Sequence, residues 1–248
     1  MRALATLAAA ALLFLGTGCD GGGNGDEGDL EIVDLSPGTG GLVELGQTLQ
    51  VTYHGRLADG TIFDSTDERG EPWYFTMVEG QVIEGWLLGL AGMEVGGTRR
   101  LIIPPHLAFG RQGRCLNDGS CPVPPNSTVT YDVTVLSVVD DVIIETVSEG
   151  VGLVADNGKL VAVSYTGTFV DGQIFDSTEF SGQPFVFVLG AGQVITGWER
   201  GLRGMREGGV RRLVVPPSMA YGSVGLQGTI PPYTTLKFRV EMIKVEDS

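Results

Sequence analysis

Polar and apolar residues alternate along three stretches of the chain, residues 48–53, 128–136 and 234–242. A period of two is typical of strands that bury one face, as the strands of antiparallel sheets do. Two shorter apolar runs that end in proline, residues 100–104 and 212–216, predict further strands. The pattern therefore predicts a chain built mainly from antiparallel sheet.

Helical spacing of apolar residues is found in one short segment of each half, residues 83–93 and 195–205. In the first of these, Trp86, Leu87 and Leu90 stand at i, i+1 and i+4, and two glycines follow the end of the segment. One short helix against a curled antiparallel sheet predicts an α+β domain.

The chain also contains an internal repeat. The sequence Ile-Phe-Asp-Ser-Thr at residues 62–66 recurs at residues 174–178, an offset of 112. Pro124-Pro125 recurs as Pro231-Pro232 with an offset of 107, so the first copy holds five additional residues. A repeat of about 110 residues is as long as a whole domain and far exceeds one unit of a solenoid. We predict two homologous domains, residues 30–140 and 141–248.

The first 18 residues have the pattern of a secretory signal peptide, with a basic start, a short apolar run and small residues before Cys19. The apolar run is shorter than the ~20 residues that span a membrane. The segment resembles the lipobox of bacterial lipoproteins, which implies lipidation of Cys19; ordinary secretion is the alternative. Residues 19–29 are rich in Gly and Asp and predict a flexible tether. We therefore expect the protein to lie on the periplasmic or cell-surface side of a bacterial membrane, held there by a lipid anchor.

The composition argues against several classes of function. The net charge of −14 opposes binding to nucleic acid or to anionic lipid through basic contacts. The chain has two histidines and three cysteines, and neither type occurs after residue 121, so the second copy has no residues for a catalytic triad, a thiolate enzyme or a zinc site. We expect no metal and no cofactor.

The five additional residues of the first copy lie in a segment that contains Cys115 and Cys121. Between these cysteines, Asn117-Asp118-Gly119 is a strong turn signal, and we predict that the two thiols pair outside the cytoplasm. A metal site with His106 is the alternative, although it has too few ligands.

Five motifs of the second copy occur in order: residues 163–167 (Val-Ser-Tyr-Thr-Gly), 175–177 (Phe-Asp-Ser), 194–198 (Val-Ile-Thr-Gly-Trp), 220–222 (Ala-Tyr-Gly) and 230–232 (Ile-Pro-Pro). Together they resemble the FKBP family of peptidyl-prolyl cis–trans isomerases, and the first copy resembles it as well. The resemblance implies a sheet wrapped on a short helix with a shallow apolar pocket between them. It also implies that the partners are Xaa-Pro segments of folding proteins, that macrolides bind the second domain, and that the chain acts as a monomer.

The resemblance implies roles for individual residues of the second domain. Trp198 would form the pocket floor, Tyr221 would offer a hydroxyl to the substrate, and Asp176 would be held by Tyr165 and a neighbouring basic residue. The backbone N–H of Ile195 would bond a substrate carbonyl. The remaining substrate-binding residues are apolar: Phe175, Phe185, Phe187, Val194, Ile230 and Phe238.

The first domain departs from this set at one catalytic position. Phe109 stands where the second copy has Tyr221, so one hydroxyl is lost, and the loop after it is rebuilt around the two cysteines. We therefore expect a weakened or altered pocket. Its substrate-binding residues are Tyr53, Phe63, Asp64, Phe75, Val82, Ile83, Trp86, Phe109 and Tyr131.

Two functions fit such pockets. The first is catalysis of proline isomerisation, mainly by the second domain, in the folding of exported proteins. Rotation about a peptide bond has a barrier of ~18–20 kcal/mol and breaks no covalent bond, so an apolar pocket without a nucleophile suffices. The alternative is a non-catalytic chaperone or scaffold that grips proline-containing segments through both pockets.

Overall fold

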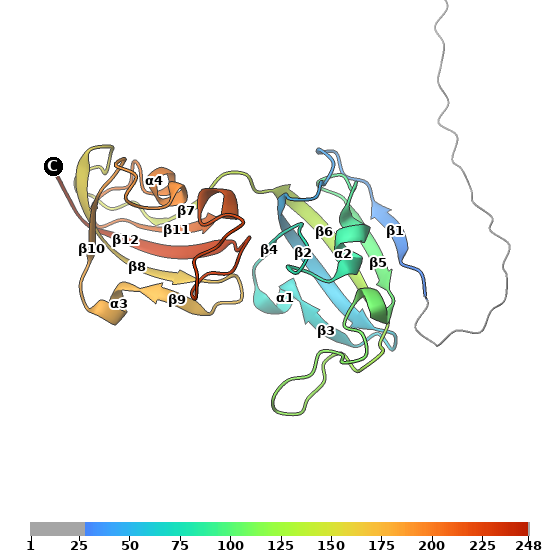
Figure 1. Cartoon of the computed structure of the whole chain (residues 1–248). Coiled ribbons are helices and arrows are strands. Elements are labelled where there is room, and N and C mark those ends of the chain that lie inside the picture. Colours follow the sequence, from blue (N-terminus) through green and yellow to red (C-terminus); the bar gives the residue numbers. More distant parts are fainter. Residues whose placement is uncertain (1–27, 248) are drawn as a thin grey trace, which may run out of the picture.

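The computed structural model of the chain describes residues 28–247, which form two six-stranded antiparallel sheets (Figure 1). The strands of the first sheet run in the order β1-β5-β6-β2-β3, and β4 also pairs with β2. They are β1 (Glu31–Ser36), β2 (Thr48–Leu57), β3 (Ile62–Ser65), β4 (Trp73–Thr76), β5 (Thr98–Ile103) and β6 (Val129–Val138).

The second sheet has the order β10-β8-β12-β11-β7, and β9 also pairs with β8. Its strands are β7 (Ile143–Ser148), β8 (Lys159–Thr168), β9 (Ile174–Ser177), β10 (Phe185–Val188), β11 (Val210–Val215) and β12 (Leu236–Asp247). We refer to the first sheet with its helices as domain 1 and to the second as domain 2. The α+β class with one sheet in each of two similar domains is confirmed.

One short helix packs on each sheet, α2 (Glu84–Leu90) in domain 1 and α4 (Thr196–Gly201) in domain 2. Both are shorter than the 83–93 and 195–205 that the apolar spacing predicted. The reason in domain 1 is that Ala91 leaves the helical region with ψ 135° and Gly92 then adopts a positive φ of 71°. A turn that bonds Met93 to Leu90 replaces the last part of the predicted helix.

Glycines form the face of each helix that touches the sheet. A Cβ added to Gly85 would lie 2.3 Å from Cγ2 of Ile103, and one added to Gly197 would lie 2.3 Å from Cγ1 of Val215. The helices therefore approach the sheets more closely than any side chain would allow. Directly after these glycines, Trp86 and Trp198 are buried in the cores of their domains, each only 4% exposed.

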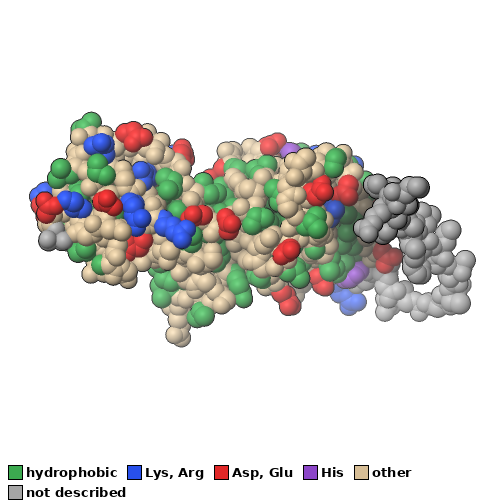
Figure 2. All heavy atoms as spheres, turned by 90° about the horizontal axis from the view of Figure 1, so that it is seen from above, with side chains coloured by type: hydrophobic (Ala, Val, Ile, Leu, Met, Phe, Trp, Pro, Cys, Tyr) green, Lys and Arg blue, Asp and Glu red, His purple; other side chains and the backbone are tan. Residues whose placement is uncertain are grey.

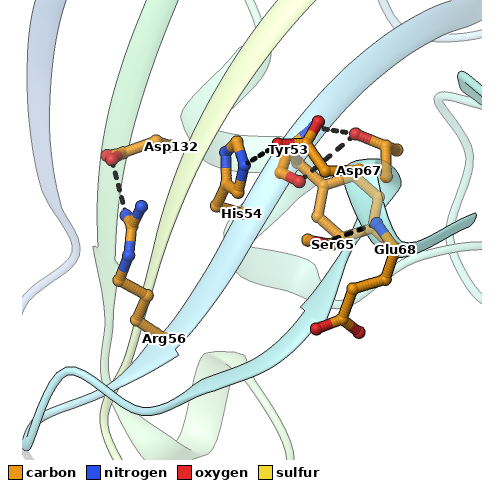
Figure 3. Close-up of polar contacts among 8 residues, drawn as sticks. Tyr53, His54, Arg56, Ser65, Asp67, Glu68 and Asp132 are labelled. Carbon is orange, nitrogen blue, oxygen red and sulfur yellow. Dashed lines mark hydrogen bonds and ion pairs between the residues drawn. The ribbon is translucent and has the colours of Figure 1, made fainter. Parts of the chain in front are cut away.

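The repeated Phe-Asp-Ser-Thr motif is explained by local hydrogen bonds at the helices α1 (Thr66–Arg69) and α3 (Thr178–Ser181). In domain 1 the Ser65 hydroxyl caps α1 by accepting from the N–H of Glu68 at 3.2 Å (Figure 3). The buried Thr66 hydroxyl accepts from the N–H of Tyr53 at 2.9 Å. In domain 2 the Thr178 hydroxyl accepts from the N–H of Tyr165 in the same way, and the Ser177 hydroxyl caps α3 by accepting from the N–H of Glu179, one residue nearer than in domain 1. The motif thus ties the strand that carries the pocket tyrosine to the next helix.

The two domains touch through polar contacts, and the space-filling view shows them as two lobes joined end to end (Figure 2). The Thr76 hydroxyl donates to the carbonyl of Tyr233 at 3.3 Å, and the Gln81 amide donates to the carbonyl of Pro232 at 3.1 Å. Lys237 of β12 pairs with Glu71, with Nζ and Oε2 2.5 Å apart. Domain 1 therefore contacts the loop that precedes the last strand of domain 2.

The predicted signal peptide, the lipidation site Cys19 and most of the tether lie outside the described residues. Two short 3₁₀ turns, Pro105–Leu107 and Pro217–Met219, complete the helical elements of residues 28–247. None of the helices in this range is long or apolar enough to cross a membrane.

The close approach of α2 to the sheet gives a test. Gly85→Ala should lower the free energy of unfolding by about 1–3 kcal/mol, because the new methyl group overlaps Ile103 in a packed core. Gly41→Ala is the matched control, since a Cβ at Gly41 has no atom within 4 Å. Urea unfolding measures both, and equal stability of the two variants would contradict the packing described here.

Candidate active site of each domain

The pocket of domain 2 is built around Trp198. Its ring centroid lies 4.9 Å from that of Tyr165, 5.3 Å from Phe238 and 6.0 Å from Phe187. The first two contacts are edge-to-face, with interplanar angles of 87° and 83°. The indole thus lies at the centre of an aromatic cluster that contains the residues named in the sequence analysis.

The other predicted residues of domain 2 surround this cluster. Ile230 is buried within it, whereas Phe185 is 40% exposed and stacks on Phe187 with centroids 5.4 Å apart. On the other side of Tyr165 and Phe185, a hollow of about 400 Å³ is lined by Asp176 and α3 and does not include Trp198. The remaining apolar residues are half-buried and pack against the same core: Phe175, Val194, Ile195 and Tyr221. All predicted residues of this domain come together at one place.

Asp176 lies at the edge of the pocket, where its Oδ2 accepts a hydrogen bond from the Tyr165 hydroxyl at 2.6 Å. Burial raises the pKa of Tyr165, and the neighbouring carboxylate raises it further, so this phenol is a protonated donor at neutral pH. The expectation of a basic residue beside Asp176 is wrong for the part of the chain that the structure describes. Asp176 is exposed and forms no ion pair there.

Each pocket floor has a buried donor without a partner. The indole Nε1 atoms of Trp86 and Trp198 have no hydrogen-bond acceptor among the described residues. A buried unpaired N–H costs free energy, so another reason must keep the indole at this position. The edge-to-face contacts of each indole with the aromatic rings around it are such a reason.

Domain 1 has the same architecture with a different set of side chains. The Trp86 centroid lies 5.2 Å from Tyr53, 5.3 Å from Phe75 and 5.2 Å from Tyr131. Tyr131 stands where domain 2 has Phe238, so the wall of this pocket carries a phenol. Phe63, Val82, Ile83 and Phe109 pack against the cluster and are half-buried.

The carboxylate of domain 1 is bound by two cations. Asp64 Oδ1 lies 2.7 Å from Arg69 Nη2, and Oδ2 lies 3.0 Å from Arg114 Nη1. Burial raises the pKa of Asp64, but the hydrogen bonds and charges of the two arginines outweigh it and hold that pKa below its ordinary value. Burial and the nearby Asp64 raise the pKa of Tyr53 to about 12.

The loop that carries Arg114 is a hairpin closed by the Cys115–Cys121 disulfide, which confirms the predicted pairing. The N–H of Arg114 donates to the carbonyl of Val123 at 2.8 Å, and the Asp118 carboxylate accepts from the N–H of Ser120 at 2.9 Å. Within residues 28–247, no group of three or more His, Cys, Asp or Glu side chains could hold a metal ion.

The sequence-based analysis did not identify Arg69 or Arg114 as partners of Asp64. A position-by-position comparison of the two copies could have identified them, because it shows where the charged residues differ. At the offset of 112, Arg69 corresponds to Ser181 and Arg114 to Leu226, so both cations are specific to the first copy.

Each of the two domains thus has one sheet and an aromatic cluster around a buried tryptophan. The profile of the FKBP-type peptidyl-prolyl cis-trans isomerase family matches residues 41–136 and 153–243. The chain belongs to this family, with one matched region in each domain.

Known relatives differ in how much of the chain they match. The isomerase FKBP10 of Bos taurus is 35% identical over 228 residues, which covers 90% of this chain and 38% of the relative. FKBP9 of Mus musculus is 33% identical over 205 residues, covering 81% of this chain and 35% of the relative. The FK506-binding protein of Neisseria meningitidis serogroup B is 50% identical over 103 residues, covering 42% of this chain and 94% of the relative. The chain thus spans little more than a third of the length of the mammalian relatives.

The lowered pKa of Asp64 predicts acid sensitivity of domain 1. Because the folded-state pKa lies below the unfolded value of about 3.9, the carboxylate stabilises the fold above that pH, and this contribution is lost as the pH falls through the folded-state pKa. Asp64→Asn should therefore show a shallower loss of stability in acid. Urea unfolding between about pH 2.5 and 6, followed by Trp73 and Trp86 fluorescence in a Trp198→Phe background, measures it.

Arg114→Leu serves as the companion variant. Removing one cation brings the folded-state pKa of Asp64 closer to its unfolded value, so the loss of stability in acid should be smaller than in the unmodified chain and complete at a higher pH. Identical acid profiles of the three proteins would contradict the ion pairs described at this site.

Proposed function

We propose that the chain catalyses cis–trans isomerisation of Xaa-Pro bonds, mainly through domain 2. The observation that carries this proposal is the Trp198 floor enclosed by Tyr165, Phe187 and Phe238, with the hydroxyl-bearing Tyr221 half-exposed at its rim. A flat apolar floor of this kind fits a proline ring, and an exchange that breaks no covalent bond needs no nucleophile.

Catalysis in this pocket rests on differential binding. The planar amide is stabilised by resonance and by water, and the twisted transition state loses the resonance. Transfer to an apolar pocket removes the water that favours the planar form, and aromatic walls hold the ring in the twisted geometry. Lowering the barrier by about 5 kcal/mol accelerates the exchange by between 10³- and 10⁴-fold.

Polar groups at the rim orient the substrate. Ile195 is the N-cap of α4, so the helix supplies no acceptor for its N–H, which is available to a substrate carbonyl. The Tyr221 hydroxyl offers a second donor, because burial raises the pKa of Tyr221 and keeps the phenol protonated. Asp176 shapes the pocket by holding Tyr165 and transfers no proton.

Domain 1 serves chiefly to bind proline segments and isomerises them more slowly. This second role is favoured by Phe109, which lacks the hydroxyl of Tyr221, and by Arg69 and Arg114, which form ion pairs with Asp64. Two pockets on one chain raise the avidity for a client that reaches both of them. A chaperone that only binds is the function that remains if neither pocket catalyses exchange.

The matched pair Tyr221→Phe and Phe109→Tyr tests the assignment of catalysis. Tyr221→Phe removes a hydrogen bond worth about 0.5–1.5 kcal/mol, so kcat/KM on a short Xaa-Pro peptide should fall about 2- to 10-fold. Phe109→Tyr adds the hydroxyl to domain 1 and, combined with Tyr221→Phe, should raise the isomerase activity that this variant retains. Exchange spectroscopy by NMR measures both.

A third variant tests the pocket floor. Trp198→Leu should remove most of the activity, whereas Trp86→Leu should remove little, because domain 1 contributes less. Circular dichroism verifies that both variants are folded. Activity that depends on Trp86 rather than Trp198 would overturn the assignment to domain 2, and a folded chain without any activity would leave only the binding role.

The relative from Neisseria is named as an FK506-binding protein, and we extend ligand binding of this type to the pocket of domain 2. Domain 1 is a weaker candidate for binding such a ligand, since the charged Arg114 lies beside Asp64 at its site. We further propose that residues 30–140 and 141–248 are the domain limits and that the chain is a monomer.

The same proposal includes export and lipid anchoring through Cys19, with residues 19–29 as the tether and the clients being exported proteins that fold on the outer side of the membrane. The Cys115–Cys121 disulfide supports this location, because disulfides persist in oxidising compartments.

Lipid anchoring is tested in a bacterial host that is supplied with labelled fatty acid. The unmodified chain should incorporate the label and sediment with membranes, and Cys19→Ala should lose both properties, because the thiol is the point of attachment. Release of the unmodified chain in soluble, unlabelled form would indicate ordinary secretion instead.

A further inference from the structure

The mouths of the two pockets differ in the sign of their local charge. In domain 1, one carboxylate, Asp64, is paired with two guanidinium groups, Arg69 and Arg114, which leaves an excess of one positive charge. In domain 2, Asp176 accepts only the neutral Tyr165 hydroxyl, which leaves one negative charge. Two pockets with the same aromatic floor therefore offer opposite electrostatic environments to a ligand.

The residues that make this difference occupy equivalent backbone positions. Arg114 forms a bridge with Val123 in domain 1, and Leu226 forms one with Ile230 in domain 2. Both Val123 and Ile230 are buried in the pocket cluster of their domain. Arg114 and Leu226 therefore stand at the same place on the rim, one as a cation and the other as an apolar side chain that is 44% exposed.

The cations of domain 1 are accessible to a ligand. The Arg114 side chain is 40% exposed, whereas that of Asp64 is 16% exposed, so the carboxylate lies inward and the guanidinium outward. A guanidinium has five N–H donors, and the Arg69 and Arg114 contacts with Asp64 each use one nitrogen. Donors therefore remain for a second acceptor at the mouth. Arg69 also lies over the Trp73 ring, 4.5 Å from its centroid, which fixes its position.

Asp67 of α1 does not cancel this charge, because it pairs on the other face of the sheet. Successive residues of a strand point to opposite faces, so Tyr53 faces the pocket and His54 faces away from it. The Asp67 carboxylate pairs with His54 on that outer face, with Oδ2 2.7 Å from Nε2 (Figure 3). The Arg56–Asp132 pair of the same figure also belongs to the outer face, since Asp132 alternates with the pocket residue Tyr131.

We propose that domain 1 selects proline segments that carry an aspartate or glutamate next to the proline, whereas domain 2 selects segments with an apolar residue there. The proposal rests on the proposed function, in which both pockets take Xaa-Pro segments. In this proposal Arg114 is the specificity-determining residue: the disulfide-closed hairpin holds its partly exposed guanidinium on Asp64 beside the aromatic cluster, where a carboxylate next to the proline would meet it. At the equivalent place Leu226 offers apolar contact.

The full chain can test this directly, because each pocket has its own reporter. The indole N–H resonances of Trp86 and Trp198 show the occupancy of domain 1 and domain 2 separately, so neither pocket has to be disabled. The probes are three peptides that differ only before proline: Ala-Glu-Pro-Phe, the neutral isostere Ala-Gln-Pro-Phe, and Ala-Leu-Pro-Phe. Titrations at low and at high salt give the affinity of each pocket for each peptide.

The Trp86 resonance should report about 3- to 10-fold tighter binding of the Glu peptide than of the Gln peptide, as charge-assisted hydrogen bonds to a partly exposed arginine allow. Salt should reduce this ratio. The Trp198 resonance should report the Leu peptide as the tightest. Arg114→Leu should abolish the Glu preference of domain 1, and Leu226→Arg should create one in domain 2.

Arg100→Leu is the matched control, because it removes the same charge from the outer face, where Arg100 pairs with Asp132. It should leave the Glu preference unchanged. Equal binding of the Glu and Gln peptides, or a preference that survives Arg114→Leu, overturns the proposal. Failure of all three peptides to bind either pocket would instead overturn the proposed function.

Discussion

The close contact between the glycine face of each helix and its sheet determines where the pockets lie. Because Gly85 and Gly197 have no side chain, the helices settle directly on Ile103 and Val215, and the next residue in each case is the tryptophan of the floor. An ordinary helix, kept further from the sheet by its side chains, would leave a gap beneath the indole. The aromatic walls then come from strands whose inward positions are fixed by the period of two, and the Phe-Asp-Ser-Thr motif locks the tyrosine strand to the following helix.

Most of this arrangement could be predicted from the sequence, because the information is local or repeated. The alternating strands, the helix beside each tryptophan and the aromatic clusters all follow from patterns of a few residues, and the resemblance of five ordered motifs joined them into one site. Seven strands were not predicted individually: β1, β3, β4 and β7 to β10. In β1 and β7 all or most of the side chains are exposed and show no alternation, and β3, β4, β9 and β10 have only four residues each. The pairing of Asp64 with Arg114 was missed because it joins positions 50 residues apart through an inserted hairpin.

A comparison of the two domains shows which amino-acid changes the fold tolerates. The floor, the helix and the motif hydrogen bonds are the same, whereas the polar groups are redistributed. Domain 2 has a hydroxyl in the loop between β11 and β12, which we call the flap, at Tyr221, and a phenyl ring on β12, which we call the wall, at Phe238. Domain 1 has the reverse, with Phe109 on the flap and Tyr131 on the wall. The position of Phe109 and Tyr221 can change in this way because it is partly solvated, whereas Tyr131 and Phe238 are buried and the exchange keeps an aromatic ring there. A change of volume at the tryptophan would disturb a packed core.

The contact between the domains has a consequence for the stability of one loop of domain 2. Thr76 and Gln81 of domain 1 hold the carbonyls of Tyr233 and Pro232, in the loop that directly follows the pocket residue Ile230. Tyr233 has a positive φ of 55°, a conformation that suits Asn126, its counterpart in domain 1, better than a bulky aromatic residue. The hydrogen bonds from Thr76 and Gln81 therefore hold a backbone turn that is strained on its own. This loop of domain 2 owes part of its stability to domain 1, so a change on the surface of one domain is transmitted to the segment beside a buried residue of the other.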